Sequence, residues 1–218
     1  MSLVLYGHPL ASYCWKVLLA LYENETPFES VTVDLSDEQQ RAELSALWPV
    51  AKFPLLRDSK RDRVVPESTI IIEYLAQHYP GKLALVPSEP ELALEARLYD
   101  RLFDTYVHGP MQTIVLDKLR PAEQSDKLGV AAARAQLEVA YGLIEQRLAA
   151  RAEPSWMLGN DFSLADCAAA PALHYANRVA PLGLQRPRTA AYLARLEARP
   201  SFARVLREAG PYFEMFPG

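Results

Sequence analysis

Hydrophobic positions near the N-terminus follow first a strand pattern and then a helix pattern. Residues 3–6 form an apolar run, the tripeptide at 7–9 interrupts it, and apolar side chains then recur on most faces of a segment from about 12 to 23. Such a segment is typical of a helix buried against a sheet. Over residues 31–35, apolar and polar residues alternate with the period of a second strand. We therefore predict a β-α-β unit.

The next stretch extends this unit into a small α/β layer structure. Residues 36–48 are mostly polar and fit one or two loose helical turns. Residues 53–56 and 64–66 are short apolar segments joined by a charged turn, a pattern that predicts a β-hairpin. A strong helical pattern follows from about 68 to 78. We assign residues 1–80 to one α/β domain.

Beyond residue 80 the pattern changes to helices alone. Pro87 and Pro90 bracket a short linker, which we assign to residues 81–90, and no convincing strand follows in 91–218. Gly109 and Pro110 are expected to end or kink the first helix of this part. The apolar periodicity fits helices at about 89–108, 124–150, 163–178, 188–198 and 201–209.

The sharpest local signal in the helical part is a helix start at residues 162–166. Ser163 and Asp166 have the spacing of a capping box, in which each side chain accepts a hydrogen bond from the other residue's backbone amide. Phe162 is placed to pack on Cys167 one turn later. Because capping explains the position of Asp166, a catalytic role for this acid has little support.

Composition excludes several classes of function. The formal net charge is −4, so the chain lacks the basic surface expected of a protein that binds nucleic acid or an anionic membrane. No run reaches the roughly 18 uncharged apolar residues of a membrane span, and no signal-peptide pattern opens the chain, so we expect a cytoplasmic protein. Cys14 and Cys167 are too few and too far apart in sequence for a disulfide framework or a zinc site.

Four segments together resemble one family. They are LYGHPLASYCWKVLLALYE at 5–23, AKFPLL at 51–56, PESTIIIEYLAQHYP at 66–80 and GNDFSLADCAAAPAL at 159–173. In this order and spacing the chain resembles the cytosolic glutathione transferases, in particular bacterial-type members with a serine-like active site, as in zeta-, theta- and beta-like proteins. The resemblance implies a thioredoxin-like N-terminal domain, an all-helical C-terminal domain, glutathione as co-substrate without a metal, and a homodimer.

The same resemblance assigns glutathione binding to five residues. The backbone of Phe53, turned outward by a cis bond to Pro54, pairs with the cysteinyl part of glutathione like an added strand. Glu67 and Ser68 begin a helix, where the serine holds the γ-glutamyl carboxylate and the acid pairs with its amino group. Lys52 resembles the position that reaches the glycyl carboxylate. An ordinary edge-strand proline, simple helix caps and a solvated lysine are the structural alternatives.

The residue that meets the sulfur is harder to assign. Serine-type members place their catalytic hydroxyl at the position that Ala11 fills, so we assign this role to Ser12, one residue later, with helix capping as the alternative. The other candidates are Tyr6 at the end of the first strand, Tyr13, and Cys14 as a residue that forms a mixed disulfide. Because Ala11 also replaces the nucleophilic cysteine of a C-x-x-C motif, disulfide exchange by that mechanism is disfavoured.

The second substrate is expected to be an apolar electrophile, bound between the first helix and the first long helix of the helical part. Leu10, Tyr106 and Met111 are the pocket candidates, and Asp100 and Asp104 are considered as partners of the glutathione amine across a dimer interface. The sequence therefore predicts a glutathione transferase. The alternatives are a glutathione-dependent isomerase or reductase at the same site, or a non-catalytic binding or regulatory module of the same fold.

Overall fold

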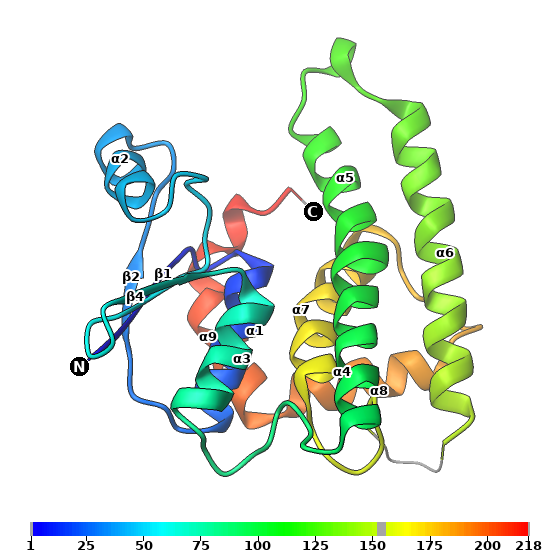
Figure 1. The fold of residues 1–218 in the computed structure, drawn as a ribbon. Coiled ribbons are helices and arrows are strands. Elements are labelled where there is room, and N and C mark those ends of the chain that lie inside the picture. The colour runs from blue at the N-terminus through cyan, green and yellow to red at the C-terminus, as the bar shows by residue number, and fades with distance from the viewer. Residues whose placement is uncertain (1, 152–155, 218) are drawn as a thin grey trace.

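The N-terminal part is a four-stranded mixed sheet with helices on both faces (Figure 1). The computed structural model describes residues 2–151 and 156–217. The elements of this part are β1 (Leu3–Gly7), α1 (Ser12–Glu23), β2 (Glu29–Thr32), α2 (Glu38–Leu47), β3 (Leu55–Asp58), β4 (Arg63–Pro66) and α3 (Ser68–His78). The strand order is β2-β1-β3-β4, with β1 parallel to β2 and the other neighbours antiparallel. This thioredoxin-like topology confirms the predicted fold class.

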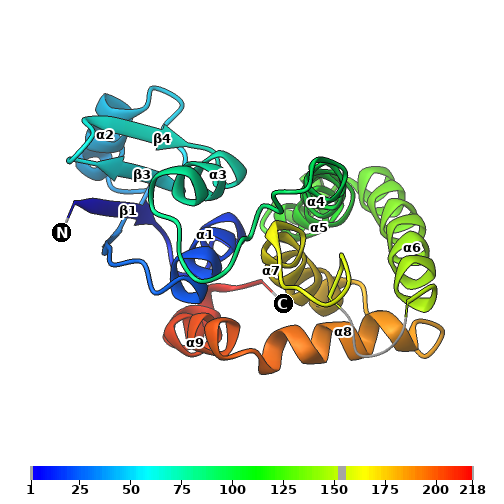
Figure 2. The same cartoon turned by 60° about the horizontal axis from the view of Figure 1, so that its bottom comes forward.

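Side-chain alternation along β1 decides which helix covers which face of the sheet. Leu3 and Leu5 are buried in one cluster with residues of α1 and α3. Tyr6 points the other way and packs in a second cluster with Leu44 of α2. Successive strand residues point to opposite faces, so one face is covered by α1 and α3 and the other by α2 (Figure 2).

The rest of the chain is helical, as predicted, and surrounds α7. Its elements are α4 (Pro90–Leu102), a π-helical turn η1 (Phe103–His108), α5 (Gly109–Lys118), a short 3-10 turn η2 (Ala122–Gln124), α6 (Lys127–Ala149), α7 (Leu164–Val179), α8 (Pro187–Ala198), α9 (Pro200–Ala209) and a 3-10 segment η3 (Gly210–Met215). The small side chains of α7 are almost all buried, so α1 and α4 pack closely against it. The division at residues 81–90 stays a prediction.

Two predicted elements differ from the structure. The second strand, expected over 31–35, is β2 and lies at Glu29–Thr32, although Val33 is still buried. The helix expected to end or kink at Gly109 and Pro110 instead continues through them as α5. Pro110 has no amide hydrogen to donate to the previous turn, and the chain adjusts by widening: the Gly109 amide bonds to the carbonyl of Asp104, five residues back.

The capping box at the start of α7 is confirmed, and it anchors the central helix. The buried carboxylate of Asp166 accepts hydrogen bonds from the amides of Ser163 and Met157, each at 2.8 Å, and from the hydroxyl of Tyr192 at 2.6 Å. Burial raises the pKa of Asp166 despite these donors. These bonds tie the start of α7 to the preceding loop and to α8, in agreement with a structural role.

Candidate functional site

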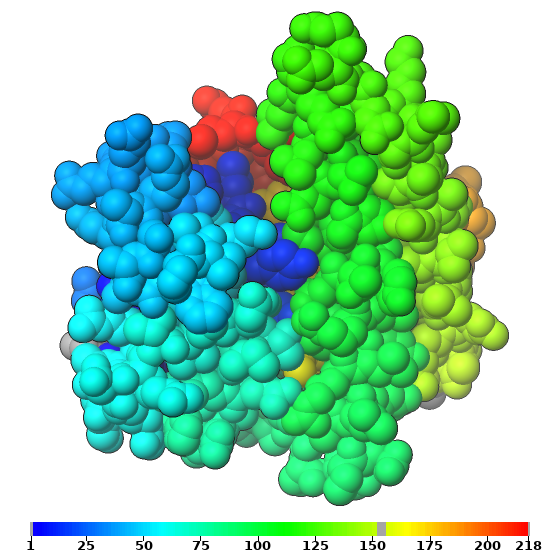
Figure 3. Space-filling view, turned by 45° about the horizontal axis from the view of Figure 1, so that its top comes forward, coloured from blue at the N-terminus to red at the C-terminus, as the bar shows by residue number. Residues whose placement is uncertain are grey.

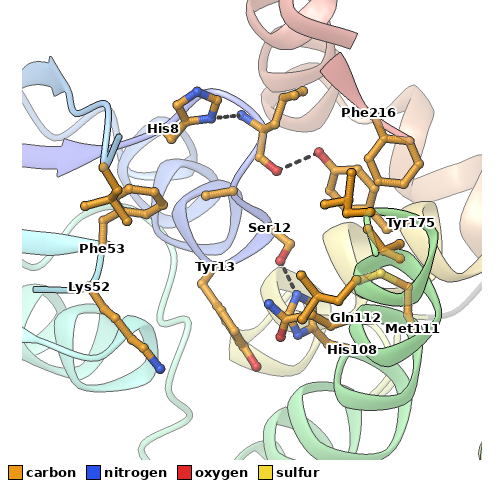
Figure 4. Close-up of a pocket in the computed structure, with 16 residues that line it drawn as sticks. His8, Ser12, Tyr13, Lys52, Phe53, His108, Met111, Gln112, Tyr175 and Phe216 are labelled. Atoms are coloured by element: carbon orange, nitrogen blue, oxygen red, sulfur yellow. Dashed lines mark hydrogen bonds between the residues drawn. The ribbon is translucent and has the colours of Figure 1, made fainter. Parts of the chain in front are cut away.

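A cavity of about 600 Å³ lies between the start of α1 and the length of α5. The surface is hollowed where the N-terminal part faces α4 and α5 (Figure 3). Ser12 and Tyr13 line the α1 side, Lys52 and Phe53 lie across from them, and His108 borders the cavity from the helical part (Figure 4). Leu10 and Met111 also line it, as expected of a second-substrate pocket. The fold thus gathers residues from three distant segments around one cavity.

Ser12 is the first residue of α1, and its hydroxyl contacts a histidine that the sequence did not single out. Its Oγ lies in hydrogen-bond contact with Nε2 of His108, the last residue of η1 (Figure 4). Ser12 is 7 % exposed and His108 is 5 % exposed. The loop before α1 is held by the Tyr175 hydroxyl, which donates to the Leu10 carbonyl at 2.8 Å. Ser12 is therefore a fixed, partly screened hydroxyl at the positive end of a helix dipole.

His108 is neutral at physiological pH. Burial, reinforced by the positive charge of Lys16, lowers its pKa from 6.5 to about 4. Its Nδ1 atom is buried and has no hydrogen-bond partner among the described residues. A neutral imidazole carries one N–H, and placing it on Nδ1 would leave a buried donor unpaired. The favoured tautomer has the proton on Nε2, which donates to Ser12 and leaves the serine hydroxyl hydrogen free to point into the cavity.

Behind this pair, Lys16 is fully buried one turn along α1. Its Nζ lies 2.5 Å from Oδ1 of Asp100, 2.8 Å from Oδ2 of Asp104 and 2.9 Å from Oγ1 of Thr69. Arg101 adds a second cation to both acids. Both acids thus face a buried lysine of their own chain, and the expectation that they hold an amine across a dimer interface stays a prediction. The cluster ties α1, α3 and α4 together beneath the cavity.

The predicted glutathione-binding residues fall in two segments, the one just before β3 and the start of α3. The bond from Phe53 to Pro54 is cis, as the resemblance implied. Phe53 and Lys52 line the cavity, whereas Pro54 is buried beneath and Ser68, at the start of α3, is 5 % exposed. Glu67 precedes α3 with a φ of 69°, a region that non-glycine residues seldom adopt and that is enriched at functional sites.

Two of the three alternative catalytic residues, Tyr6 and Cys14, are less well placed than Ser12, whereas Tyr13 shares its cavity. Tyr6 packs on the α2 face of the sheet and does not line the cavity. Cys14 is buried inside α1, and burial raises its thiol pKa to about 12, which disfavours a reactive thiolate. Tyr13 lines the cavity with its ring centroid 4.2 Å from that of His108, and burial followed by the nearby Asp104 charge raises its pKa to about 12.

Of the three pocket candidates, Tyr106 lies outside the cavity. Its side chain is 58 % exposed and does not line the cavity, so the expectation is corrected. The widened turn η1 sets which residues of this segment face inward, and it is His108 that does so. No sequence signal marked His108 or Lys16, because their partners lie 96 and 88 residues away along the chain.

Among the described residues, no helix is both long and apolar enough to cross a bilayer. In the same residues, no group of three or more His, Cys, Asp or Glu side chains is arranged to hold a metal ion.

Comparisons with known proteins agree with this architecture. Residues 5–83 match the family model of the glutathione S-transferase N-terminal domain, and residues 127–207 match that of the C-terminal domain. Glutathione S-transferase GstB of Escherichia coli K12 is 27 % identical over 94 % of this chain and 97 % of its own. A probable maleylacetoacetate isomerase of Vibrio cholerae is 30 % identical over 97 % and 98 %.

Solved structures extend the likeness to the whole fold. A glutathione S-transferase from Methylobacillus flagellatus with glutathione bound superposes with a TM-score of 0.84, at 24 % identity over 94 % of this chain and 98 % of that one. One from Methylobacterium radiotolerans, in complex with glutathione sulfonate, has a TM-score of 0.80 at 28 % identity over 93 % of both chains. The chain belongs to the cytosolic glutathione S-transferase family.

Proposed function

We propose that this protein conjugates glutathione to a soft apolar electrophile, with Ser12 stabilising the glutathione thiolate. One observation carries the proposal: a serine hydroxyl at the start of α1, held by a neutral His108, lines a cavity that Phe53 also borders. The donor faces the place where a cysteinyl sulfur would lie if the glutathione backbone pairs with Phe53 as an added strand.

The energy required is within reach of this arrangement. An unperturbed thiol has a pKa of about 8.5, and lowering it by about two units requires roughly 2.7 kcal/mol. One hydrogen bond to a charged acceptor contributes about 1.5–3 kcal/mol, and a helix N-terminus adds about 0.3–1 kcal/mol. The Ser12 hydroxyl supplies the hydrogen bond, and the position of Ser12 as the first residue of α1 supplies the helix N-terminus. The resulting thiolate then attacks the electrophilic carbon.

Binding of the rest of glutathione is assigned from the family pattern. Lys52 takes the glycyl carboxylate, and the Phe53 backbone before Pro54 takes the cysteinyl unit. Ser68 and the α3 amides take the γ-glutamyl carboxylate, while Glu67 takes its amino group. The charge signs fit each partner, and the Glu67 carboxylate adds a smaller contribution to burial and the Asp104 charge, which together raise the pKa of the cavity-lining Tyr13.

An isomerase that uses glutathione as a cofactor is the second candidate. Probable maleylacetoacetate isomerases of Vibrio cholerae and Caenorhabditis elegans are 30 % and 29 % identical to this chain. A reductase that depends on a protein thiol is disfavoured, because Cys14 is buried within α1. A non-catalytic module would bind glutathione without turning it over.

One experiment separates the transferase from the non-catalytic module. Glutathione binding is measured by calorimetry, and conjugation of a chlorinated nitroaromatic is measured in wild type, Ser12→Ala and Ser88→Ala. Ser88 is an exposed serine remote from the cavity and serves as the control. We expect Ser12→Ala to retain glutathione binding and to lose about ten- to hundredfold in kcat/KM. Absence of glutathione binding in wild type would refute the proposal, and binding without turnover would favour the module.

We also infer a cytoplasmic homodimer. Ile70 on α3 and Leu94 and Leu98 on α4 are 52 %, 63 % and 60 % exposed, an apolar set beyond what a monomer's surface requires. Light scattering tests the assembly: Leu94→Glu with Leu98→Glu is expected to give a monomer, whereas Leu184→Glu, at a fully exposed leucine between α7 and α8, leaves the dimer intact. A wild-type monomer contradicts the inference.

A further inference from the structure

A second cavity, of about 390 Å³, lies between α1, the edge strand β2 and α9, and we call it the α9 cavity. Helix α9 packs beside α1 (Figure 2). Neither Ser12 nor any residue assigned to glutathione is among the described residues that line it. Its volume is within the range of about 300–1,000 Å³ that is usual for small-molecule sites. The protein thus has a second space for a ligand, separate from the active-site cavity.

Short side chains on β2 and α9 leave this space open. Successive residues of a strand point to opposite faces, so Ser30 lines the α9 cavity while Val31 packs on the α2 face. On α9, Ala209 lines the cavity from the other side. A core that closed against α1 would place larger apolar side chains at these two positions. The gap is therefore a consequence of the residues chosen there.

Aromatic side chains form most of the wall of the α9 cavity. They are Trp15, Tyr22, Phe28 and Tyr212. The rings of Tyr22 and Phe28 lie 5.9 Å apart between centroids, and the ring of Tyr212 stands edge-on to His8 at 6.1 Å. Aromatic rings favour offset or edge-to-face contact with another ring. The wall therefore suits a flat aromatic ligand.

The charges at the α9 cavity are already paired. Among the described residues that line it, Arg204 and Glu208 form an ion pair at 2.8 Å, and the Tyr22 hydroxyl donates to Glu208 at 2.6 Å. Burial lowers the pKa of His8, so its imidazole is neutral at physiological pH. A charged ligand would lose hydration here without an unpaired partner. The Ser30 hydroxyl can bond the polar edge of an uncharged one.

The loop at 8–11, between β1 and α1, separates the two cavities. His8 lines both of them, and its Nδ1 accepts a hydrogen bond from the Leu10 amide at 3.2 Å (Figure 4). The Trp15 indole, in the wall of the α9 cavity, donates to the Pro9 carbonyl at 2.5 Å. A molecule in the α9 cavity therefore contacts the same loop that leads directly into Ser12.

We propose that the α9 cavity is an effector site, which binds a flat, uncharged aromatic molecule and thereby tightens the binding of glutathione. Both cavities are open in one conformation of the loop at 8–11, and a ligand in either cavity stabilises that conformation. Such coupling is reciprocal, so glutathione tightens the binding of the aromatic molecule by the same factor. The aromatic site stands on its own geometry, whereas its coupling to glutathione rests on the proposed function.

The probe for the site is 2-naphthol, which is uncharged at neutral pH. Its dissociation constant is measured by calorimetry in the presence of saturating S-hexylglutathione, which occupies the active-site cavity. We expect one remaining site for 2-naphthol. The anion 2-naphthoate is expected to bind at least about tenfold more weakly, and the saturated analogue 2-decalol about two- to tenfold more weakly. Displacement of 2-naphthol by S-hexylglutathione would place it in the active-site cavity and overturn the inference.

Two tyrosine substitutions on β2 locate the probe. Ser30→Tyr adds a ring that fills the α9 cavity, while Glu29→Tyr adds the same ring at an exposed position that lines neither cavity. Tyrosine is well tolerated in strands, and thermal unfolding checks that both variants fold. Ser30→Tyr is expected to weaken 2-naphthol at least about tenfold, and the control to leave it unchanged. Tyr212→Ala, which removes one wall, is expected to weaken it about two- to tenfold.

The coupling is measured as the ratio of glutathione dissociation constants without and with saturating 2-naphthol. We expect about a fivefold ratio in wild type and Glu29→Tyr, and none in Ser30→Tyr. Unchanged or weakened glutathione binding overturns the effector role. Absence of 2-naphthol binding, or equal binding in Ser30→Tyr, overturns the site itself. If glutathione fails to bind to wild type, the proposed function and the coupling are refuted, while the 2-naphthol measurements on the variants still decide the site.

Discussion

Replacing His108 tests whether the partner of Ser12 organises the proposed catalytic hydroxyl. In His108→Ala the serine loses the Nε2–H donor, and its own hydrogen is no longer directed into the cavity. We expect the pKa of enzyme-bound glutathione to rise and kcat/KM to fall. His108→Gln retains an amide N–H at a similar reach from the backbone and is expected to restore part of the effect.

The size of the effect follows from the chain of hydrogen bonds. The bond from Ser12 to a thiolate contributes about 1.5–3 kcal/mol. A donor behind it strengthens such a bond by roughly 10–30 %, or about 0.2–0.9 kcal/mol. This corresponds to a rise in the thiol pKa of about 0.1–0.7 and to a loss of up to about fivefold in kcat/KM. Ser12→Ala, which removes the whole bond, should be clearly worse.

The assay is the thiolate absorbance of the glutathione complex, titrated with pH, together with the pH profile of kcat/KM. His78→Ala, at a half-buried histidine of α3 outside the cavity, is the control. A thiol pKa in His108→Ala equal to that of wild type would refute the relay from His108 to Ser12. A loss in His108→Ala larger than that in Ser12→Ala would also refute it, and would assign the sulfur contact to His108 itself.

Three further predictions concern the buried groups around the site. The pKa of His108 is about 4 in the folded protein and about 6.5 in the unfolded chain, so the unfolded chain binds more protons between these pH values. As the pH falls from 7 to 4, wild type should therefore lose about 3 kcal/mol of stability relative to His108→Gln, measured by chemical denaturation. A difference in stability that does not change with pH contradicts this. Lys16→Met should lower the free energy of unfolding by about 3–5 kcal/mol, because Asp100 and Asp104 lose their buried cation. A loss below about 1 kcal/mol would mean that Arg101 balances the charge of the two acids. Cys14 should resist alkylation by iodoacetamide in the native protein and react only after unfolding, as mass spectrometry can follow; rapid native labelling would restore it as a candidate nucleophile.

Much of the fold could be predicted from local patterns in the sequence. The apolar run of β1, the two strands of the hairpin and the periodicity of α6 to α9 were visible along the chain, because each depends on neighbours within a few residues. The capping box of Ser163 and Asp166 was visible for the same reason. The exceptions are α5 and the end of α4, where Gly109 and Pro110 suggested a break. A π-helical turn before Gly109 accommodates Pro110, which has no amide donor, without ending the helical segment.

In the candidate site, too, some features follow from local sequence motifs and others from tertiary packing. The sequence by itself determined a hydroxyl at the start of α1, a proline-linked edge at Phe53, and an acid and serine at the start of α3, since each is a short motif with its own chemistry. Tertiary structure decided that Tyr6 faces α2, that Cys14 is buried, and that His108 meets Ser12 while Lys16 neutralises Asp100 and Asp104. These contacts join residues about ninety positions apart, and no local periodicity encodes them. Burial then sets their protonation, because desolvation depends on everything that packs around a group.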